Sequence, residues 1–417
     1  MRLLVKNISS LVTMGGKNGP RCGSEMMDAK IIHDGWVAVE DDRIMSLGSG
    51  KAPDKNFETV IDARGKTVTP GLIDPHTHLI YGGSRENELE MKLKGASYID
   101  ILKAGGGILS TVKATRAMSK EELKQSAKKS LLEMLKYGTT TCEAKSGYGL
   151  NLKDEIKSLE AIRELNFEQP VTLIPTYLGA HAVPLEYKNC REMYIKEMIE
   201  DVIPIISRRK LAEFIDCFCE EGVFSIDESR RILKAGIDAG LKAKIHADEM
   251  EPMGGARLAA ELKAVSADHL LAADEEGLIS MRDSGVIPVL LPATSFYLML
   301  GKYADARKMI ELGLPVALAT DYNPGTCPTE SLQTVMTFAC FGMKMAPKEI
   351  ITAMTMNAAC AISRENEIGS IEEGKKADIV IFDCPNLNYI VYHFGINHVS
   401  IVIKNGKIVV NNTNGGI

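Results

Sequence analysis

The feature that most constrains this fold is an alternation of short apolar runs with helical patterns, repeated eight times through the middle of the chain. The runs have the length and the β-branched content of buried strands. They are Gly71–His76, Thr139–Lys145, Val171–Leu178, Phe214–Cys219, Ala243–His246, Val265–His269, Val286–Leu291 and Val316–Asp321. Helical patterns occupy most gaps: Lys120–Tyr137, Asp154–Leu165, Arg191–Ser207, Asp227–Ala239 and Asp274–Ser284. This alternation predicts an α/β fold, a (β/α)8 TIM-like barrel, with an open doubly wound sheet as the alternative.

The two ends of the chain have a different, β-rich texture with frequent turn residues. Near the start the expected strands are Leu3–Asn7, Gly35–Glu40, Arg43–Gly48 and Thr59–Asp62. Near the end they are Ala377–Phe382 and Val399–Val410, the latter divided by the turn Asn405-Gly406. We expect both ends to form one small β-sandwich domain, residues 1–69 with 371–417, beside a barrel domain of residues 70–370.

Composition excludes several classes of protein. The 417 residues are 45% hydrophobic and 25% charged, ordinary values for a globular chain. The net charge is −6, and Lys and Arg form no basic stripe, so no nucleic-acid partner is expected. No apolar run approaches the roughly 18 residues of a membrane span, and no secretion signal is evident. Nine cysteines without zinc-ribbon spacing are interpreted as reduced thiols, and we expect a cytoplasmic protein.

Four of the eight histidines and one aspartate fall at the carboxyl ends of expected strands. His76 and His78 end the first strand, His246 the fifth, His269 the sixth and Asp321 the eighth. In a barrel these ends converge on the face where catalytic groups gather. Residues two apart on a strand point the same way, so His76 and His78 can share one cation. Three histidines and an aspartate suit Zn²⁺ or Fe²⁺. The pattern therefore predicts a metal site at His76, His78, His246 and Asp321. A metal bound there would activate water.

Several motifs resemble those of the amidohydrolase superfamily. Residues 70–78, Pro-Gly-Leu-Ile-Asp-Pro-His-Thr-His, are similar to the motif that opens the barrel in that superfamily. Residues 368–378 resemble the segment with which such chains return to their small β domain. A further set, in this order along nearly the whole chain, resembles the imidazolonepropionase family: residues 82–86, 104–108, 145–149, 178–184 and 321–326.

The resemblance implies a homodimeric hydrolase that opens the cyclic amide of 4-imidazolone-5-propanoate to give N-formimidoyl-L-glutamate in histidine degradation. It implies one Zn or Fe ion per chain, bound by the four residues above. It also implies substrate contacts from Arg85, Tyr148, His181, Glu249, Asn323, Gly325 and Thr326. Another cyclic amidase or a deaminase on the same scaffold is the nearer alternative, and a non-catalytic interaction protein is the more distant one.

The residues themselves suggest how the substrate is held. A guanidinium recognises a carboxylate through its fork of donors, and Arg85 follows the first metal-binding strand closely. A surface salt bridge is the alternative for Arg85. Tyr148 and His181 stand on loops after the second and third strands, so both belong to the same end of the barrel, where packing or capping roles are the alternatives.

Acid–base roles are expected for three residues at this end. We expect Asp321 to accept a proton from the attacking water and to pass it to the leaving ring nitrogen. His269 would stabilise the oxyanion, with a satisfied core histidine as the alternative. Glu249 would hold the ring.

The number of metal ions depends on the end of the fourth strand. Many relatives in the superfamily carry a carbamylated lysine there that bridges two cations. This chain reads Phe-Cys-Glu-Glu-Gly at residues 218–222, so one metal is expected, with Glu220 as the alternative bridge. Lys145, at the end of the second strand, is expected to support the metal ligands from behind or to form salt bridges.

Overall fold

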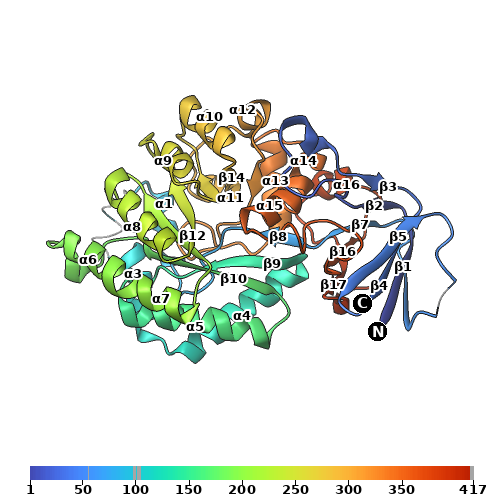
Figure 1. Cartoon of the computed structure of the whole chain (residues 1–417), viewed down its shortest axis with the longest axis horizontal. Helices are drawn as coiled ribbons and strands as arrows, with labels where there is room; N and C mark the ends of the chain where they lie inside the picture. Colours follow the sequence, from blue (N-terminus) through green and yellow to red (C-terminus); the bar gives the residue numbers. More distant parts are fainter. Residues whose placement is uncertain (55, 97–99, 101–104, 414–417) are drawn as a thin grey trace.

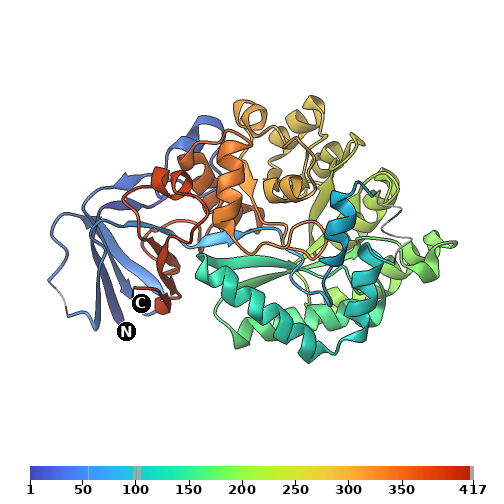
Figure 2. The ribbon, with the colours of Figure 1, turned by 180° about the vertical axis from the view of Figure 1, so that it is seen from behind.

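The computed structural model describes the chain except residues 55, 97–99, 101–104 and 414–417. Ala104, in one of the motifs above, and the last four residues of the expected β domain lie outside the described residues. A helix-rich barrel stands beside a unit of β-sheets that holds both termini (Figure 1). Figure 2 shows the same arrangement from behind.

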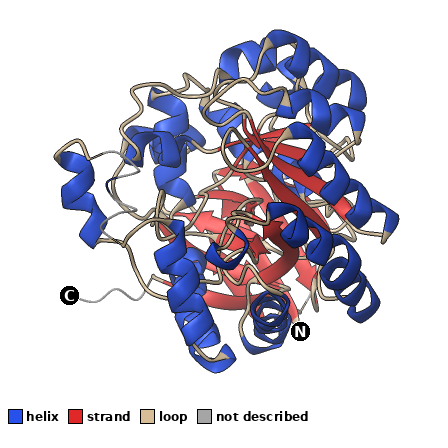
Figure 3. Cartoon of the chain, turned by 90° about the vertical axis from the view of Figure 1, so that its left-hand side faces the viewer, coloured by secondary structure: helices blue, strands red, loops and turns tan. Residues whose placement is uncertain are grey.

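Eight parallel strands form the centre of the barrel, with helices around them (Figure 3). They neighbour one another in chain order: β8 (Leu72–Asp74), β9 (Thr139–Lys145), β10 (Thr172–Ala180), β11 (Phe214–Cys219), β12 (Lys242–Ala247), β13 (Ser266–His269), β14 (Ile287–Leu290) and β15 (Ala317–Leu318). In a doubly wound sheet the strand order would reverse, whereas here it follows the chain from first to last. The predicted barrel is therefore confirmed.

The first and last barrel strands meet just beyond their own ends. Thr77 and Tyr322 form an isolated parallel bridge. The Asp321 N–H donates to the His76 carbonyl at 3.1 Å, and the His78 N–H donates to the Tyr322 carbonyl at 2.9 Å. These bonds close the ring at its carboxyl end and bring the candidate metal ligands of both strands together.

Helices cover the outside of the barrel. Their bounds are α1 (Asn87–Leu93), α3 (Ile108–Ala117), α4 (Lys120–Lys136), α5 (Leu152–Glu168), α6 (Arg191–Glu197), α7 (Ile203–Arg209), α8 (Ile226–Asp238), α9 (Gly255–Glu261), α10 (Glu275–Ser284), α11 (Pro292–Tyr297), α12 (Ala306–Glu311), α13 (Leu332–Phe341), α14 (Pro347–Ala353), α15 (Met356–Ala361) and α16 (Leu387–Tyr392). No helix within the described part of the chain combines the length and apolar character that a bilayer span requires.

Local sequence explains where two of these helices begin. Ser119 and Glu122 cap the start of α4, each side chain accepting the backbone N–H of the other. The predicted helix Arg191–Ser207 is divided instead by a π-helical turn, Met198–Val202, between α6 and α7. Pro204, in the first turn of α7, has no N–H to donate to Glu200, so the regular hydrogen-bond pattern is interrupted there.

The β unit consists of two sheets. The first contains β5 (Arg43–Ser49), β4 (Gly35–Glu40), β1 (Arg2–Ile8) and β6 (Thr59–Asp62). The second contains β18 (Lys407–Asn411), β17 (Val399–Lys404), β16 (Ile379–Phe382), β7 (Thr67–Pro70), β2 (Ser10–Val12) and β3 (Ile31–Ile32). Antiparallel pairing of β7 with β16 joins the two chain ends, as the sequence predicted. The domain boundaries at 69/70 and 370/371 stay a prediction.

Strand β16 of the second sheet is buried on both faces. Its Ile379 and Ile381 belong to the same hydrophobic cluster as Leu3 and Val5 of the first sheet. Val380, the residue between the two isoleucines, points the other way and joins the barrel core. Hydrophobic burial on two sides therefore attaches the β unit firmly to the barrel.

Gly406 gives a test of how closely the two sheets fit. It lies in the turn between β17 and β18 with φ of +74°, and a Cβ at this position would overlap the Asp41 carbonyl oxygen. We expect Gly406→Ala to lower the free energy of unfolding by about 3 kcal/mol, from the left-handed backbone and from the overlap. Gly285→Ala is the matched control, because its φ is +76° but its Cβ would meet open space. Urea unfolding that gave equal losses for both variants would contradict the close fit.

Candidate metal centre

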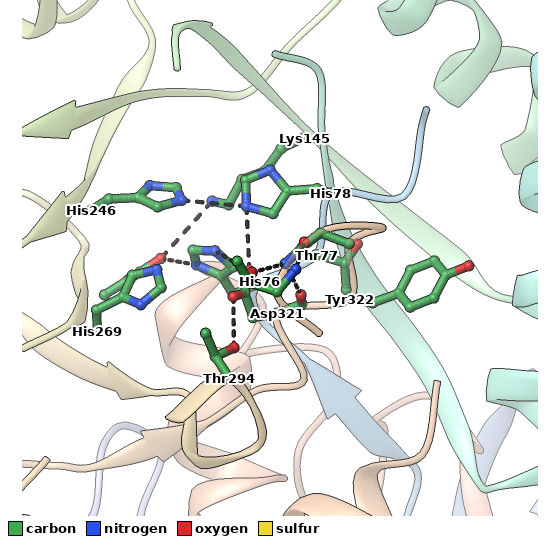
Figure 4. Close-up of polar contacts among 12 residues, drawn as sticks. His76, Thr77, His78, Lys145, His246, His269, Thr294, Asp321 and Tyr322 are labelled. Atoms are coloured by element: carbon green, nitrogen blue, oxygen red, sulfur yellow. Dashed lines mark hydrogen bonds and ion pairs between the residues drawn. The ribbon is translucent and has the colours of Figure 1, made fainter. Parts of the chain in front are cut away.

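Four side chains meet at the carboxyl end of the barrel (Figure 4). His76 and His78 follow β8, His246 lies on β12, and Asp321 follows β15. Asp321 Oδ1 lies 3.5 Å from His76 Nε2 and 3.4 Å from His78 Nε2. His246 Nε2 lies 3.4 Å from His78 Nε2, and all four residues are buried. The structure thus brings together the whole ligand set that the strand ends predicted.

Three distances between these atoms, Asp321 to His76, Asp321 to His78 and His246 to His78, fit ligands that share a cation. Tetrahedral coordination with bonds of about 2.0–2.2 Å separates the ligand atoms by roughly 3.4 Å. The buried His76 Nε2 has no hydrogen-bond partner among the described residues. A buried ring nitrogen without a partner is costly unless it binds a ligand. Imidazole nitrogens with one carboxylate oxygen suit a divalent metal, so the residues present fit the ion that the strand pattern predicted.

Carboxylates hold two of the histidine rings from behind. His76 Nδ1 bonds Asp268 Oδ2 at 2.6 Å. His246 Nδ1 lies 3.0 Å from Asp216 Oδ2, without the alignment of a full hydrogen bond. Both Nε2 atoms therefore face the shared centre. Burial lowers the pKa of His76, but its carboxylate partners outweigh burial and raise it to about 9.

Asp321 supplies the anionic oxygen of the set. Burial alone would raise its pKa, but contacts with His76 and His78 hold that pKa well below its usual range. Its second oxygen, Oδ2, accepts a hydrogen bond from Thr294 Oγ1 at 2.7 Å. The backbone φ of Asp321 is +58°, a conformation that non-glycine residues adopt mainly where structure or function requires it.

His269 and Glu249 form a pair beside the four ligands. The His269 ring centroid lies 5.2 Å from that of His246 and 5.5 Å from that of His76. His269 Nδ1 lies 3.6 Å from Glu249 Oε1. Burial lowers the pKa of His269 and raises the pKa of Glu249. The nitrogens of His76, His246 and His269 lie within 4.8 Å of one another, so His269 stands directly beside two of the predicted ligands.

Glu220 is engaged elsewhere and does not face a second metal. Its Oε2 accepts the backbone N–H groups of Glu249 and Met250, both at 3.0 Å. Its Oε1 accepts those of Glu251 at 3.2 Å and Glu221 at 3.1 Å. The carboxylate therefore fixes the loop that carries Glu249, and its oxygens are already occupied.

Arg85 lies in a compact cluster at the barrel mouth. Its Nε and Nη2 donate to the two oxygens of Glu88 at 2.8 and 2.9 Å. A Cβ at Gly325 would overlap the Arg85 guanidinium, so a larger residue there would force Arg85 to shift. Lys92 Nζ donates to the Gly325 carbonyl at 2.7 Å. The predicted contacts Arg85 and Gly325 are thus direct neighbours, and Glu88 was not foreseen.

His181 and Tyr148 lie next to the metal site. The His181 ring stacks on His78 with centroids 4.8 Å apart and planes 17° apart. Its Nδ1 bonds the Gly147 carbonyl at 2.9 Å, and burial lowers its pKa to about 3, so the ring is neutral with Nε2 as an acceptor. The Tyr148 ring lies 5.1 Å from His181 and 6.0 Å from His78.

Asn323 shapes the loop that follows Asp321. Its Oδ1 accepts the N–H groups of Gly325 and Thr326, at 2.8 and 2.7 Å. Its Nδ2 donates to the Asp321 carbonyl and to Thr326 Oγ1, both at 2.7 Å. Asn323 thereby holds the loop in place, and the predicted substrate contacts of Asn323 and Thr326 stay predictions.

Sequence reasoning also missed Asp216 and Asp268, which orient the two histidines. Both are completely buried within strands. A signal was present, because an acidic residue inside an apolar strand is rarely tolerated without a partner. The partner of each could not be read from the sequence, since it lies on another strand.

Comparisons with known proteins agree with this geometry. An amidohydrolase family model matches residues 177–409, and a second amidohydrolase family model matches residues 59–97. The imidazolonepropionases of Alkaliphilus oremlandii and Alkaliphilus metalliredigens are 60% and 56% identical, each over 98% of both chains. The solved structure of a zinc-complexed atrazine chlorohydrolase from Arthrobacter aurescens covers 98% of this chain and 95% of its own, with a TM-score of 0.73 and 16% identity, which is a likeness of fold. The chain belongs to the imidazolonepropionase family of amidohydrolases.

Proposed function

We propose that this chain hydrolyses the ring amide of 4-imidazolone-5-propanoate to N-formimidoyl-L-glutamate, a step of histidine degradation. The observation that carries the proposal is the convergence of His76, His78, His246 and Asp321 on one point. Relatives named imidazolonepropionase, 56% and 60% identical over 98% of the chain, support this substrate.

One Zn or Fe ion per chain would be held by these four residues. When bound, such an ion lowers the pKa of water to about 7 and polarises a carbonyl. The occupied carboxylate of Glu220 supports one ion instead of a bridged pair. The homodimer and the cytoplasmic location expected from the sequence stay predictions.

Side chains among and beside the metal ligands carry out the acid–base steps. Asp321 accepts a proton from the attacking water and passes it to the leaving ring nitrogen. Thr294 fixes Asp321 Oδ2 and so orients the carboxylate. His269, kept neutral by burial, stabilises the oxyanion that forms on the ring carbonyl.

The substrate is held from the loops around this point. Arg85 binds the propanoate, since Glu88 engages only its Nε and Nη2 and leaves Nη1 directed at the loop of Gly325. The neutral His181 and the buried Glu249 bind the ring N–H groups. Tyr148 closes the side of the site next to His181.

Direct turnover tests the function. The purified protein should abolish the ultraviolet absorbance of 4-imidazolone-5-propanoate, and elemental analysis should find about one Zn or Fe per chain. Chelation should remove the activity, and Zn²⁺ or Fe²⁺ should restore it. A panel of other cyclic amides and amino-heterocycles should react at least about 100-fold less efficiently. Better turnover of any of these would favour the alternative, another cyclic amidase or a deaminase.

The proton-transfer role is tested by Asp321→Asn. The variant should fold, and at saturating metal its kcat should fall at least about 100-fold, because general acid–base catalysis contributes that much or more. Metal content, measured on the same sample, separates lost chemistry from lost metal. Asp283→Asn, on an exposed part of α10, is the control and should keep native kcat. A native kcat in Asp321→Asn would show that Asp321 does not transfer the proton.

The carboxylate contact is tested by Arg85→Met. Its KM should rise roughly 10- to 100-fold, because a charge-assisted hydrogen bond contributes about 1.5–3 kcal/mol. An imidazolone that lacks the propanoate arm should be turned over equally by the native and variant chains. Arg257→Met, which removes an exposed ion pair, should leave KM unchanged. An equal loss for both substrates would assign Arg85 a purely structural role.

A further inference from the structure

Lys145 lies beside the metal site (Figure 4). It also joins the carboxylates that hold two of the histidines. It ends β9 and is completely buried. Its Nζ donates to Asp216 Oδ2 at 2.7 Å and to Glu143 Oε1 at 2.8 Å. Asp268 Oδ2 lies 3.9 Å from the same nitrogen. One ammonium group thus reaches both aspartates that orient the ligands.

The same carboxylate oxygens face the histidines. Asp216 Oδ2, which accepts from Lys145, lies 3.0 Å from His246 Nδ1. Asp268 Oδ2, the oxygen nearer to Lys145, bonds His76 Nδ1 at 2.6 Å. Each of these oxygens therefore lies between the lysine and one metal-binding ring. A change in the position of the lysine side chain would therefore alter the orientation of both rings.

The remaining carboxylate oxygens are tied to the barrel wall. Asp216 Oδ1 accepts the backbone N–H of Cys217 at 2.7 Å. Asp268 Oδ1 accepts Ser266 Oγ at 2.6 Å. Lys145, Asp216 and Asp268 come from β9, β11 and β13, which are alternate strands whose inward side chains share a layer of the barrel. The lysine thus fixes the second oxygen of two otherwise anchored carboxylates.

We propose that Lys145 is a positioning residue which, through Asp216 and Asp268, aims the rings of His246 and His76 at the metal. The inference rests on the metal site proposed above. It differs from simple charge balance inside the barrel, in which the lysine would only offset buried carboxylates.

The two roles predict changes of opposite sign in metal affinity. Removing a positive charge next to a cation site strengthens cation binding by Coulomb's law. Removing the group that orients two ligand rings weakens it, and the loss of such a partner typically costs about 10- to 100-fold in metal affinity. The direction of the change therefore distinguishes a positioning residue from a counter-charge.

The test measures the Zn²⁺ dissociation constant of the metal-free protein by competition with a chelator, without substrate. Lys145→Met and Lys145→Gln should each bind Zn²⁺ at least about tenfold more weakly than the native chain. Lys244→Met is the matched control, because Lys244 is also completely buried. It contacts the Pro75 and Ala361 carbonyls and Glu143, and its removal should leave Zn²⁺ affinity unchanged or tighter.

A coupled variant shows whether the lysine acts through the aspartates. In a chain that already carries Asp216→Asn and Asp268→Asn, adding Lys145→Met should cause no further loss of Zn²⁺ affinity. A further tenfold loss in that background would overturn the proposed route.

Three other results would be decisive. Zn²⁺ affinity of both Lys145 variants equal to or tighter than native would overturn the inference. Metal-free Lys145→Met and Lys145→Gln that show no native circular dichroism would also overturn it, because the lysine would then be needed by the fold itself. A native chain that binds no Zn²⁺ or Fe²⁺ would instead remove the proposed function.

Discussion

Two backbone hydrogen bonds, from Asp321 to His76 and from His78 to Tyr322, join the ends of the first and last barrel strands. They complete a ring that β15, only two residues long, could not close alone. The same bonds set the distance between the paired histidines and the aspartate, which are separated by more than 240 residues of chain. Closure of the barrel and assembly of the metal site are therefore one structural event.

Several residues at the carboxyl ends of the barrel strands leave the regular strand conformation. Asp321 and His269 have φ of +58° and +77°, and Asp248, next to the metal-binding strand β12, has φ of +49°. Each such residue costs about 1–2 kcal/mol relative to an ordinary conformation. Local hydrogen bonds offset this cost, for example those that the backbone N–H groups of Gly254 and Gly255 donate to Asp248 Oδ1. At the end of β13 two consecutive residues, Asp268 and His269, both lie beside His76.

Strand periodicity was sufficient to predict much of this from sequence. The bounds of β9 and β11 match the prediction to the residue, because both are apolar runs flanked by clear turns. His76 and His78 were found by their spacing. The short helices α11 to α15 were missed, since six to ten residues carry too little hydrophobic periodicity to stand out. The loop-anchoring role of Glu220 was missed because its partners are backbone groups, which no sequence pattern marks.

The interior charges favour a divalent cation in this barrel. Acidic side chains outnumber ammonium groups among the completely buried residues around the site: Asp74, Glu143, Asp216, Glu220 and Asp268 against Lys145 and Lys244. Ionised Asp321 adds a further carboxylate beside the histidines. Buried charge without a partner is strongly destabilising. A divalent cation held by the four ligands would offset part of this negative charge, so its binding would contribute to the stability of the barrel as well as to its chemistry. The sequence that places acidic residues in the strands and histidines at their ends therefore specifies the fold and its metal together.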